Sequence, residues 1–212
     1  MKLTVLFPFM EDSFSQNTLS FIKYLSWLQH THKIDLLITV DKSGRTADAL
    51  KKEHLSYEEV PFRSPVNIGD FYLIALFKLI RSTLPSFFYF KAHRIDVVHC
   101  PDVLSLLCWG NTSKMNRVPF ITSIQKYEKF SHYASLMLAD SRKNICHTEE
   151  IREKIPSRFS AKALLAPEAQ DIPENLNTDT AQKNTVDFWI QLYASLFVKP
   201  DLSKITGILN KN

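Results

Sequence analysis

Residues 96–109 read DVVHCPDVLSLLCW, and they place a buried strand directly before a helix. The β-branched pair Val97 and Val98 predicts a strand over 95–100, and the apolar residues of 103–115 predict a helix. A continuous apolar strand that leads at once into a helix is typical of a parallel α/β sheet. The histidine, the cysteine and the aspartate between the two elements therefore stand where a strand ends.

The same alternation of strands and helices continues on both sides of this stretch. Further apolar runs predict strands over 3–9, 34–40, 55–62, 118–124, 144–147 and 161–167. Helical spacing predicts helices over 15–29, 46–53 and 148–155. A further helix is expected from a cap at Asn67 to Pro85, with a second segment continuing to about Arg94. We expect one α/β domain with a mostly parallel sheet that is covered on both faces.

The net charge of +4 comes from one segment of the chain. Residues 73–94 carry Lys78, Arg81, Lys91 and Arg94 and no acid, while the other 22 basic residues match the 22 acidic ones. A nucleic-acid-binding protein is usually more basic overall, so we expect no nucleic-acid partner. Two interpretations remain open: a helix packed on the sheet with its cations reaching solvent, or a patch that faces an anionic membrane surface.

The cysteine count and the apolar runs bear on location. The three cysteines, Cys100, Cys108 and Cys146, are odd in number and form no CxxC motif, which favours a reducing compartment. No stretch approaches the ~18 consecutive apolar residues that a spanning helix needs, and the N-terminus does not resemble a signal peptide. We expect a cytoplasmic protein, with peripheral attachment to the inner face of the membrane as the alternative.

Polar side chains at the carboxyl ends of the expected strands are the candidate binding residues. In a doubly wound sheet, ligands bind in the crevice outside these strand ends. His99 has a competing interpretation as a strand-end histidine that is bonded to a neighbouring backbone carbonyl. The candidates for binding an acceptor are Glu11, Asp12, Ser13, His99, Asp102, Gln125, Lys126, His147 and Glu149.

The order of these elements resembles the N-terminal, acceptor-side domain of glycosyltransferase family 4, which is one half of a GT-B fold. The resemblance covers about residues 1–171. The stretches that carry it are MKLTVLFPF (1–9), RIDVVHCPDVLSLL (94–107), NRVPFITSIQ (116–125), ADSRKNICHTEEIREKI (139–155) and ALLAPEAQD (163–171). It implies a Rossmann-like domain that holds a glycan or lipid-linked acceptor.

Three departures from the family pattern bear on activity. The loop 10–17 contains no glycine, whereas family members usually have adjacent glycines there. Gln125 and Lys126 stand where the family usually has His-Gly, and a glutamine cannot act as an acid or base. No two glutamates are eight positions apart, although the family's donor-binding domain carries such a pair. The resemblance therefore implies that the donor-binding domain is missing, and we expect no cofactor.

The C-terminal part is expected to hold a helix that packs back on the domain. We predict a domain over 1–171, a polar linker over 172–184, and a crossing helix and tail over 185–212. The helix is expected over 185–197 with Asn184 as its cap, and its apolar stripe includes Trp189 and Tyr193. An ordinary C-terminal core helix would show the same stripe.

Two functions follow as hypotheses. The first is a glycosyltransferase-like, acceptor-binding domain for cell-envelope or polysaccharide synthesis that needs a separate donor-binding subunit and is inactive alone. The second is a non-catalytic binding or scaffold protein. A zinc site built from His99-Cys100 and Cys146-His147 is disfavoured, because adjacent strand residues point to opposite faces. A triad of Ser105, Ser123 or Ser135 with a histidine and an aspartate is weaker still, because no GxSxG motif is present.

Overall fold

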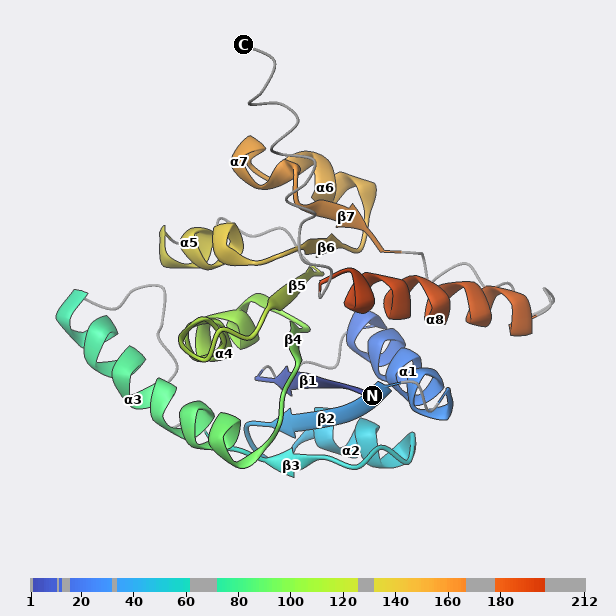
Figure 1. Ribbon diagram of the computed structural model, residues 1–212, viewed down its shortest axis with the longest axis horizontal. Helices are drawn as coiled ribbons and strands as arrows, with labels where there is room; N and C mark the ends of the chain where they lie inside the picture. Colours follow the sequence, from blue (N-terminus) through green and yellow to red (C-terminus); the bar gives the residue numbers. More distant parts are fainter. Residues whose placement is uncertain are drawn as a thin grey trace, which may run out of the picture.

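The computed structural model describes residues 2–10, 12, 16–31, 34–61, 72–125, 132–166 and 178–196. These residues form a seven-stranded sheet with the order β3-β2-β1-β4-β5-β6-β7, in which every adjacent pair is parallel (Figure 1). The strands are β1 (Leu3–Phe9), β2 (Ile34–Val40), β3 (Glu58–Glu59), β4 (Val97–Cys100), β5 (Phe120–Ile124), β6 (Asn144–Cys146) and β7 (Ala163–Leu165). The expected α/β class with a Rossmann-like parallel sheet is confirmed.

Helices cover both faces of this sheet. They are α1 (Gln16–His30), α2 (Arg45–Lys52), α3 (Tyr72–Ala92), α4 (Val103–Met115), α5 (His132–Asp140), α6 (Glu149–Lys154), α7 (Ser157–Ser160) and α8 (Thr178–Ser195). The strand order reverses at β1, which lies between β2 and β4. Such a reversal is the place where ligands bind in open α/β sheets.

Alternation along the strands divides the interior into two hydrophobic cores. In β1, Val5 and Phe7 point to the core shared with α1, α2 and α8, while Leu6 points to the core shared with α3 to α7. Both cores consist mainly of buried side chains, and each fully buried Val, Leu, Ile, Phe or Met contributes roughly 1.5–3 kcal/mol to folding. The sheet therefore forms a rigid platform whose carboxyl edge can position polar groups.

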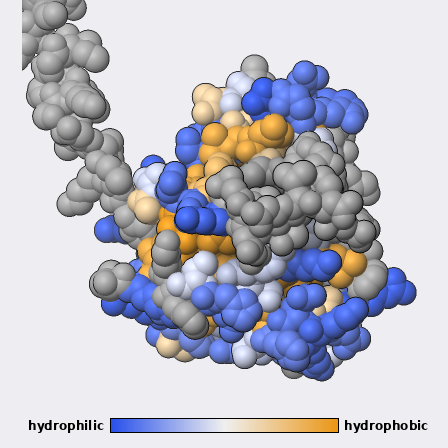
Figure 2. All heavy atoms as spheres, turned by 90° about the vertical axis from the view of Figure 1, so that its right-hand side faces the viewer, coloured by the Kyte–Doolittle hydropathy of each residue, from blue (hydrophilic) through white to orange (hydrophobic). Residues whose placement is uncertain are grey.

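Helix α8 packs back on the domain, as expected, but it is longer than expected. It begins at Thr178, so residues 178–184 of the predicted linker are helical and Asn184 lies inside the helix instead of capping it. Trp189 and Tyr193 are buried in the core with α1, and Figure 1 shows α8 (red) lying beside α1 (blue). On the side shown in Figure 2, apolar atoms form a band between hydrophilic areas.

Two predictions about the segment before β4 are wrong. Residues 55–62 were expected as a strand, yet β3 spans only Glu58–Glu59, because this strand forms the edge of the sheet and both its residues are exposed. Pro85 was expected to end a helix, yet α3 runs through it. Packing of the next turn on α4 compensates for the backbone hydrogen bond that proline cannot donate. The expected cap at Asn67 lies outside the described residues.

Candidate functional site

The carboxyl edge of the sheet gathers most of the predicted site residues. Asp12 follows β1, Asp102 follows β4, Gln125 follows β5, and His147 and Glu149 follow β6. His99 is the penultimate residue of β4. Glu11, Ser13 and Lys126 lie outside the described residues, so their placement stays a prediction. The ligand role of all nine candidates also stays a prediction.

His99 is fully buried and both of its ring nitrogens are hydrogen-bonded. Nδ1 lies 2.7 Å from the Tyr193 hydroxyl and Nε2 lies 2.8 Å from the Ser123 hydroxyl. His99 is thus hydrogen-bonded, as in the competing interpretation, but its partners are two side-chain hydroxyls and not the backbone carbonyl which that interpretation named. Burial, reinforced by the nearby His147, holds the pKa of His99 well below its ordinary value. The ring is neutral, so one nitrogen donates and the other accepts.

Aromatic rings enclose His99 on the side of the sheet that α8 covers. The centroids of Phe7, Phe21, Trp189 and Tyr193 lie 5.3, 5.1, 5.0 and 5.9 Å from its ring. A ligand cannot reach the imidazole while α8 lies in place. The structure thus gives His99 the role of a polar tie between β4, β5 and α8.

Asp102 caps helix α4. Its Oδ1 accepts a hydrogen bond from the Ser105 backbone N–H at 2.6 Å, and its Oδ2 accepts one from the Ser105 hydroxyl at 2.8 Å. The Ser105 Oγ in turn accepts a hydrogen bond from the Met10 N–H at 3.3 Å. A helix N-terminus at this edge often receives a phosphate, but here the chain's own carboxylate occupies it. An anionic ligand is therefore disfavoured at this helix end.

Asp12 plays a comparable part for α2. The N-cap position, Gly44, has no side chain, and the Asp12 carboxylate accepts the hydrogen bond from the Thr46 N–H at 3.0 Å. A Cβ atom at Gly44 would lie 2.4 Å from the Asp12 carboxylate oxygen, so a larger residue would displace this cap. The first loop lacks the glycines of the family pattern, and Asp12 there serves a helix.

Gln125 and His147 follow the neighbouring strands β5 and β6. The Gln125 side chain donates a hydrogen bond to the Pro101 carbonyl at 3.1 Å. The His147 N–H donates one to the Ile124 carbonyl at 3.3 Å, but its Nε2 is buried without a hydrogen-bond partner among the described residues. Burial lowers the pKa of His147 to about 4. His147 is a neutral imidazole whose position the local fold leaves unexplained.

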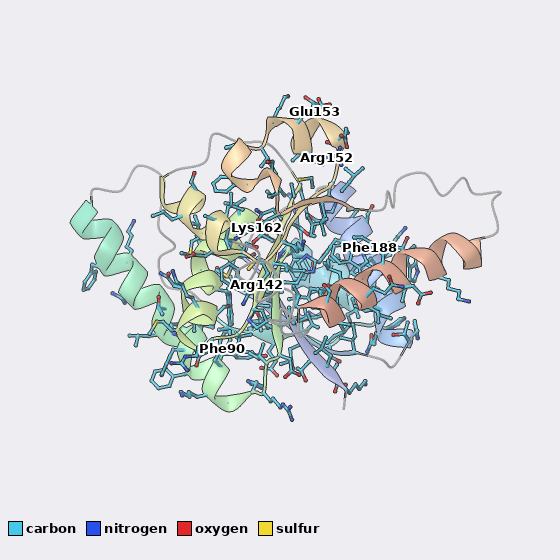
Figure 3. All side chains as sticks on the ribbon, turned by 45° about the horizontal axis from the view of Figure 1, so that its top comes forward. Phe90, Arg142, Arg152, Glu153, Lys162 and Phe188 are labelled. Carbon is cyan, nitrogen blue, oxygen red and sulfur yellow. The ribbon has the colours of Figure 1, made fainter. Side chains whose placement is uncertain are left out.

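The residues after His147 have structural partners of their own. The Thr148 hydroxyl accepts a hydrogen bond from the Ile151 N–H at 3.3 Å and caps α6. Glu149 is exposed and pairs with Arg152 on the same helix. Figure 3 shows Arg152 and Glu153 at the outer side of α6, away from the sheet. Glu149 therefore points to the periphery of the edge.

The cysteines and histidines do not form a metal centre in the described part of the chain, where no three His, Cys, Asp or Glu side chains cluster suitably. Strand alternation puts Cys100 and Cys146 in one core and His99 in the other. All three cysteines are free thiols, and burial raises the pKa of Cys108 to about 12 and that of Cys146 to about 11. Protonated thiols are poor metal ligands.

The serine hydroxyls that the sequence offered as nucleophiles also have other roles. Ser105 belongs to the α4 cap, and Ser135 is buried on α5. Ser123 does contact a histidine, but the third member of this chain is Tyr193, and all three side chains are buried. The Ser123–His99–Tyr193 set therefore has no access to a substrate in this structure.

The basic patch lies on and just after α3, before β4 begins. Arg81 and Lys91 are exposed, and Lys78 is partly exposed. Arg94 is not an independent cation, because its Nε lies 3.7 Å from the Asp96 carboxylate. No helix in the described part of the chain is long and apolar enough to cross a membrane.

Sequence reasoning missed the partners of His99. Tyr193 belongs to the apolar stripe that was predicted for the C-terminal helix, but it is 94 residues from His99, and no local pattern joins them. Ser123 lies in a predicted strand, where its contact depends on the pairing of β4 with β5.

Comparison with known proteins identifies the fold of the chain but not its family. No protein-family model matches the chain, and no curated protein sequence matches it. Among solved structures, MurG of Acinetobacter baumannii is similar with a TM-score of 0.56 and 13% identity over 77% of this chain and 45% of that one. The lipopolysaccharide outer core galactosyltransferase WaaB gives a TM-score of 0.59 and 13% identity over 78% and 45%.

An epimerase shows the same similarity. The UDP-GlcNAc 2-epimerase of Neisseria meningitidis, bound to UDP-GlcNAc, gives a TM-score of 0.58 and 12% identity over 79% of this chain and 47% of that one. The chain thus spans slightly less than half the length of the proteins it matches. Identities this low establish the fold alone, which is the Rossmann-like α/β half of a GT-B protein.

Proposed function

We propose that this chain is the acceptor-side half of a glycosyltransferase for cell-envelope or polysaccharide glycans. The observation that carries the proposal is the fold: a parallel sheet in the order 3-2-1-4-5-6-7 that matches half of WaaB, a lipopolysaccharide galactosyltransferase. The partner is a glycan or a lipid-linked acceptor that lies at the carboxyl edge of the sheet. The free thiols of Cys100, Cys108 and Cys146 support a cytoplasmic location.

A separate donor-binding subunit completes the proposed enzyme. In sugar transfer, an acceptor oxygen bonds to the anomeric carbon, the bond from that carbon to the diphosphate breaks, and a base takes the hydroxyl proton. The leaving diphosphate needs fixed positive charge or N–H donors. At the described edge, the α4 N-terminus is already occupied by Asp102. The proposal therefore assigns diphosphate stabilisation to another subunit.

Within this half, His147 and Gln125 are the residues we assign to acceptor contact. The pKa of His147 is about 4, so the ring is neutral at pH 7 and its unprotonated nitrogen can accept a hydrogen bond from a hydroxyl. Gln125 can exchange its bond with the Pro101 carbonyl for one with a sugar hydroxyl. Glu11, Ser13 and Lys126, which lie outside the described residues, are proposed as further acceptor contacts.

A second candidate, a non-catalytic binding or scaffold protein, is favoured by one specific observation. Most polar groups that the sequence brings to this edge already serve the fold. Asp12 caps α2, Asp102 caps α4, and His99 is enclosed beneath α8. A catalytic edge normally keeps such groups available to substrate.

A transfer and hydrolysis assay tests the proposal. The purified chain is incubated with UDP-glucose, UDP-galactose or UDP-GlcNAc, first alone and then with the co-expressed products of neighbouring genes. We expect no turnover by the chain alone and transfer in the presence of a donor-binding subunit. Turnover by the chain alone that His147→Gln abolishes would contradict the two-subunit proposal. No transfer with any neighbouring product would favour the scaffold function.

A further inference from the structure

Helix α3 exposes a face that is both apolar and cationic. Phe77, Leu84 and Phe88 are 65%, 52% and 66% exposed, and they make up three of the five exposed large hydrophobic residues in the described part of the chain. Arg81 and Lys91, also exposed, fall on the same face, because positions 77, 81, 84, 88 and 91 repeat at intervals of three and four. These five residues, here named the α3 face, extend over roughly 21 Å at 1.5 Å per residue.

Contacts on the opposite side fix this face toward solvent. The Ser86 hydroxyl lies 2.5 Å from the Thr112 hydroxyl of α4, and both groups are buried. The rings of Tyr89 and Phe90 pack against Trp109 with centroids 5.6 and 6.2 Å apart. Figure 3 places Phe90 where α3 meets α4, and Figure 1 shows α3 at the outer edge of the molecule. The helix cannot turn its exposed phenylalanines inward without losing these contacts.

The charged side chains that α3 itself carries have one sign. Residues 73–94 contain no acid, and the Lys91 ammonium lies 5.3 Å from the centroid of the Phe87 ring, at the border of the face. Lys78 flanks the face from the next position on the helix. Arg94 contributes less than the sequence suggested, because Asp96 shares its charge. The cationic part of the surface is therefore chiefly Arg81 and Lys91, with Lys78 beside them.

The apolar and cationic side chains of the α3 face fit one of three possible partners: a second copy of the chain, a purely ionic partner or an anionic lipid surface. A second copy of the chain would oppose Arg81 and Lys91 with the same cations, which is unfavourable unless acids lie between them. A purely ionic partner would leave the apolar tips of Phe77, Leu84 and Phe88 unused. Anionic lipid headgroups above an acyl boundary match both parts, because apolar side chains enter the boundary while cations meet the phosphates.

We propose that the α3 face docks this protein on an anionic membrane surface, with α3 lying flat in the headgroup region. Phe77, Leu84 and Phe88 enter the acyl boundary, and Arg81 and Lys91 contact lipid phosphates. This inference does not depend on the proposed transferase function, since it rests on exposure and charge alone. It confines the protein to a surface and turns the opposite side of the sheet, with α8, toward the aqueous phase.

Sedimentation with lipid vesicles tests the proposal. The full chain is mixed with vesicles of phosphatidylglycerol and phosphatidylcholine in equal parts, and with vesicles of phosphatidylcholine alone. We expect binding to the anionic vesicles that weakens as salt rises from 50 to 500 mM. Arg81→Gln with Lys91→Gln should lower the partition coefficient by about 30-fold, and Phe77→Ser with Phe88→Ser by at least about tenfold.

Matched variants distinguish binding through the α3 face from non-specific binding to vesicles. Lys52→Gln with Arg142→Gln removes two exposed cations elsewhere, and Met115→Ser with Leu136→Ser removes two exposed apolar side chains elsewhere. Both should bind vesicles like the parent. Equal loss in these controls, equal binding by all variants, or no binding by the parent would overturn the proposal. The proposal would also be overturned if the parent protein did not bind vesicles but dimerised with rising concentration, and if Phe77→Ser with Phe88→Ser abolished that dimerisation.

Fold integrity is checked by the unfolding midpoint of each variant. The substituted side chains are exposed, so we expect shifts within the error of the measurement. Should one variant unfold, the salt and lipid dependence of the parent still decides the question. Salt-independent binding, or equal binding to neutral vesicles, would contradict an anionic docking surface.

Discussion

Helices α3 and α8 are both long and rich in aromatic residues, yet two aromatic side chains of α8 are buried while two of those on α3 are exposed. Trp189 and Tyr193 of α8 lie in the core among Phe7, Phe21 and His99. On α3, Phe77 and Phe88 face outward while the other side of the helix packs on α4. The same amphipathic signal thus marks a core helix in one region and a surface with apolar tips in the other.

The difference shows what hydrophobic periodicity can and cannot tell. An apolar stripe predicts which side chains share a helix face, but the partner of that face depends on the three-dimensional arrangement. Helix α8 has one apolar stripe and buries it. Helix α3 is apolar on two faces, so one of them stays exposed once α4 has covered the other.

The largest expected effect is in the core of α8. Trp189→Ala should lower the free energy of unfolding by roughly 3–5 kcal/mol, because the indole packs on Tyr24, Phe21 and His99. The matched variant on α3, Phe88→Ala, should change it by less than about 0.5 kcal/mol. Urea denaturation followed by circular dichroism measures both. Equal losses would mean that the two helices are equally buried.

Acid should weaken the half of the domain that α8 covers. The pKa of His147 is about 4 in the folded protein and about 6.5 when unfolded, so the unfolded chain binds more protons between these values. Stability is therefore complete above pH 6.5 and is lost as pH falls toward 4, by about 3 kcal/mol for this residue. His99 adds in the same direction.

Urea denaturation at half-unit pH steps from 4 to 8 tests this dependence. His147→Gln should make the profile less steep, because glutamine does not titrate and only the contribution of His99 remains of the two. Parallel profiles for the parent and the variant would show that His147 is not the responsible group.

A smaller effect is expected at the buried hydrogen bonds of α8. Tyr193→Phe removes the hydroxyl that lies 2.7 Å from His99 Nδ1 and should cost about 1–3 kcal/mol, because the imidazole nitrogen is left buried and unpaired. Tyr24→Phe removes only a 3.5 Å contact to the same hydroxyl and should cost less than about 1 kcal/mol. Thermal and urea unfolding of both variants measure the ratio. The reverse order would assign the tie to Tyr24.

A modest stability effect concerns the N-cap of α4, the helix on which α3 packs. Asp102→Ala should cost about 1 kcal/mol through loss of the N-cap, whereas Asp102→Ser should keep most of it. Chemical denaturation compares the two. If Asp102→Ala and the parent had the same free energy of unfolding, Asp102 would not stabilise α4 and would again be a candidate ligand contact.

Much of the fold could be predicted from the sequence, because continuous apolar strands that alternate with helices leave few architectures. The errors fall where tertiary packing decides. Helix α3 continues through Pro85 because Ser86 and Phe90 pack on α4. Helix α8 begins as early as Thr178 because the apolar residues of its later turns, among them Trp189 and Tyr193, are held in the core. Length was overestimated at β3, since an edge strand pairs on one side only.

The candidate site was less predictable than the fold. The predicted strand ends indicated which residues reach the carboxyl edge, and Gln125 and His147 follow β5 and β6 there. Their ligand role stays a prediction. The strand ends did not predict that Asp12 and Asp102 would cap helices. Each cap requires a helix N-terminus to lie next to the carboxylate, and that position depends on how the whole sheet is assembled. His99 required knowledge of a helix 94 residues away.

The central claim is that the carboxyl edge binds a glycan acceptor and no nucleotide. Amide chemical-shift mapping of the labelled chain tests it directly, with disaccharides that end in glucose, galactose or N-acetylglucosamine, and separately with UDP. The account predicts saturable shifts around Gln125, Cys146 and His147 with at least one glycan, their loss in His147→Gln, and no shifts with UDP. Shifts with UDP and none with any glycan would contradict it.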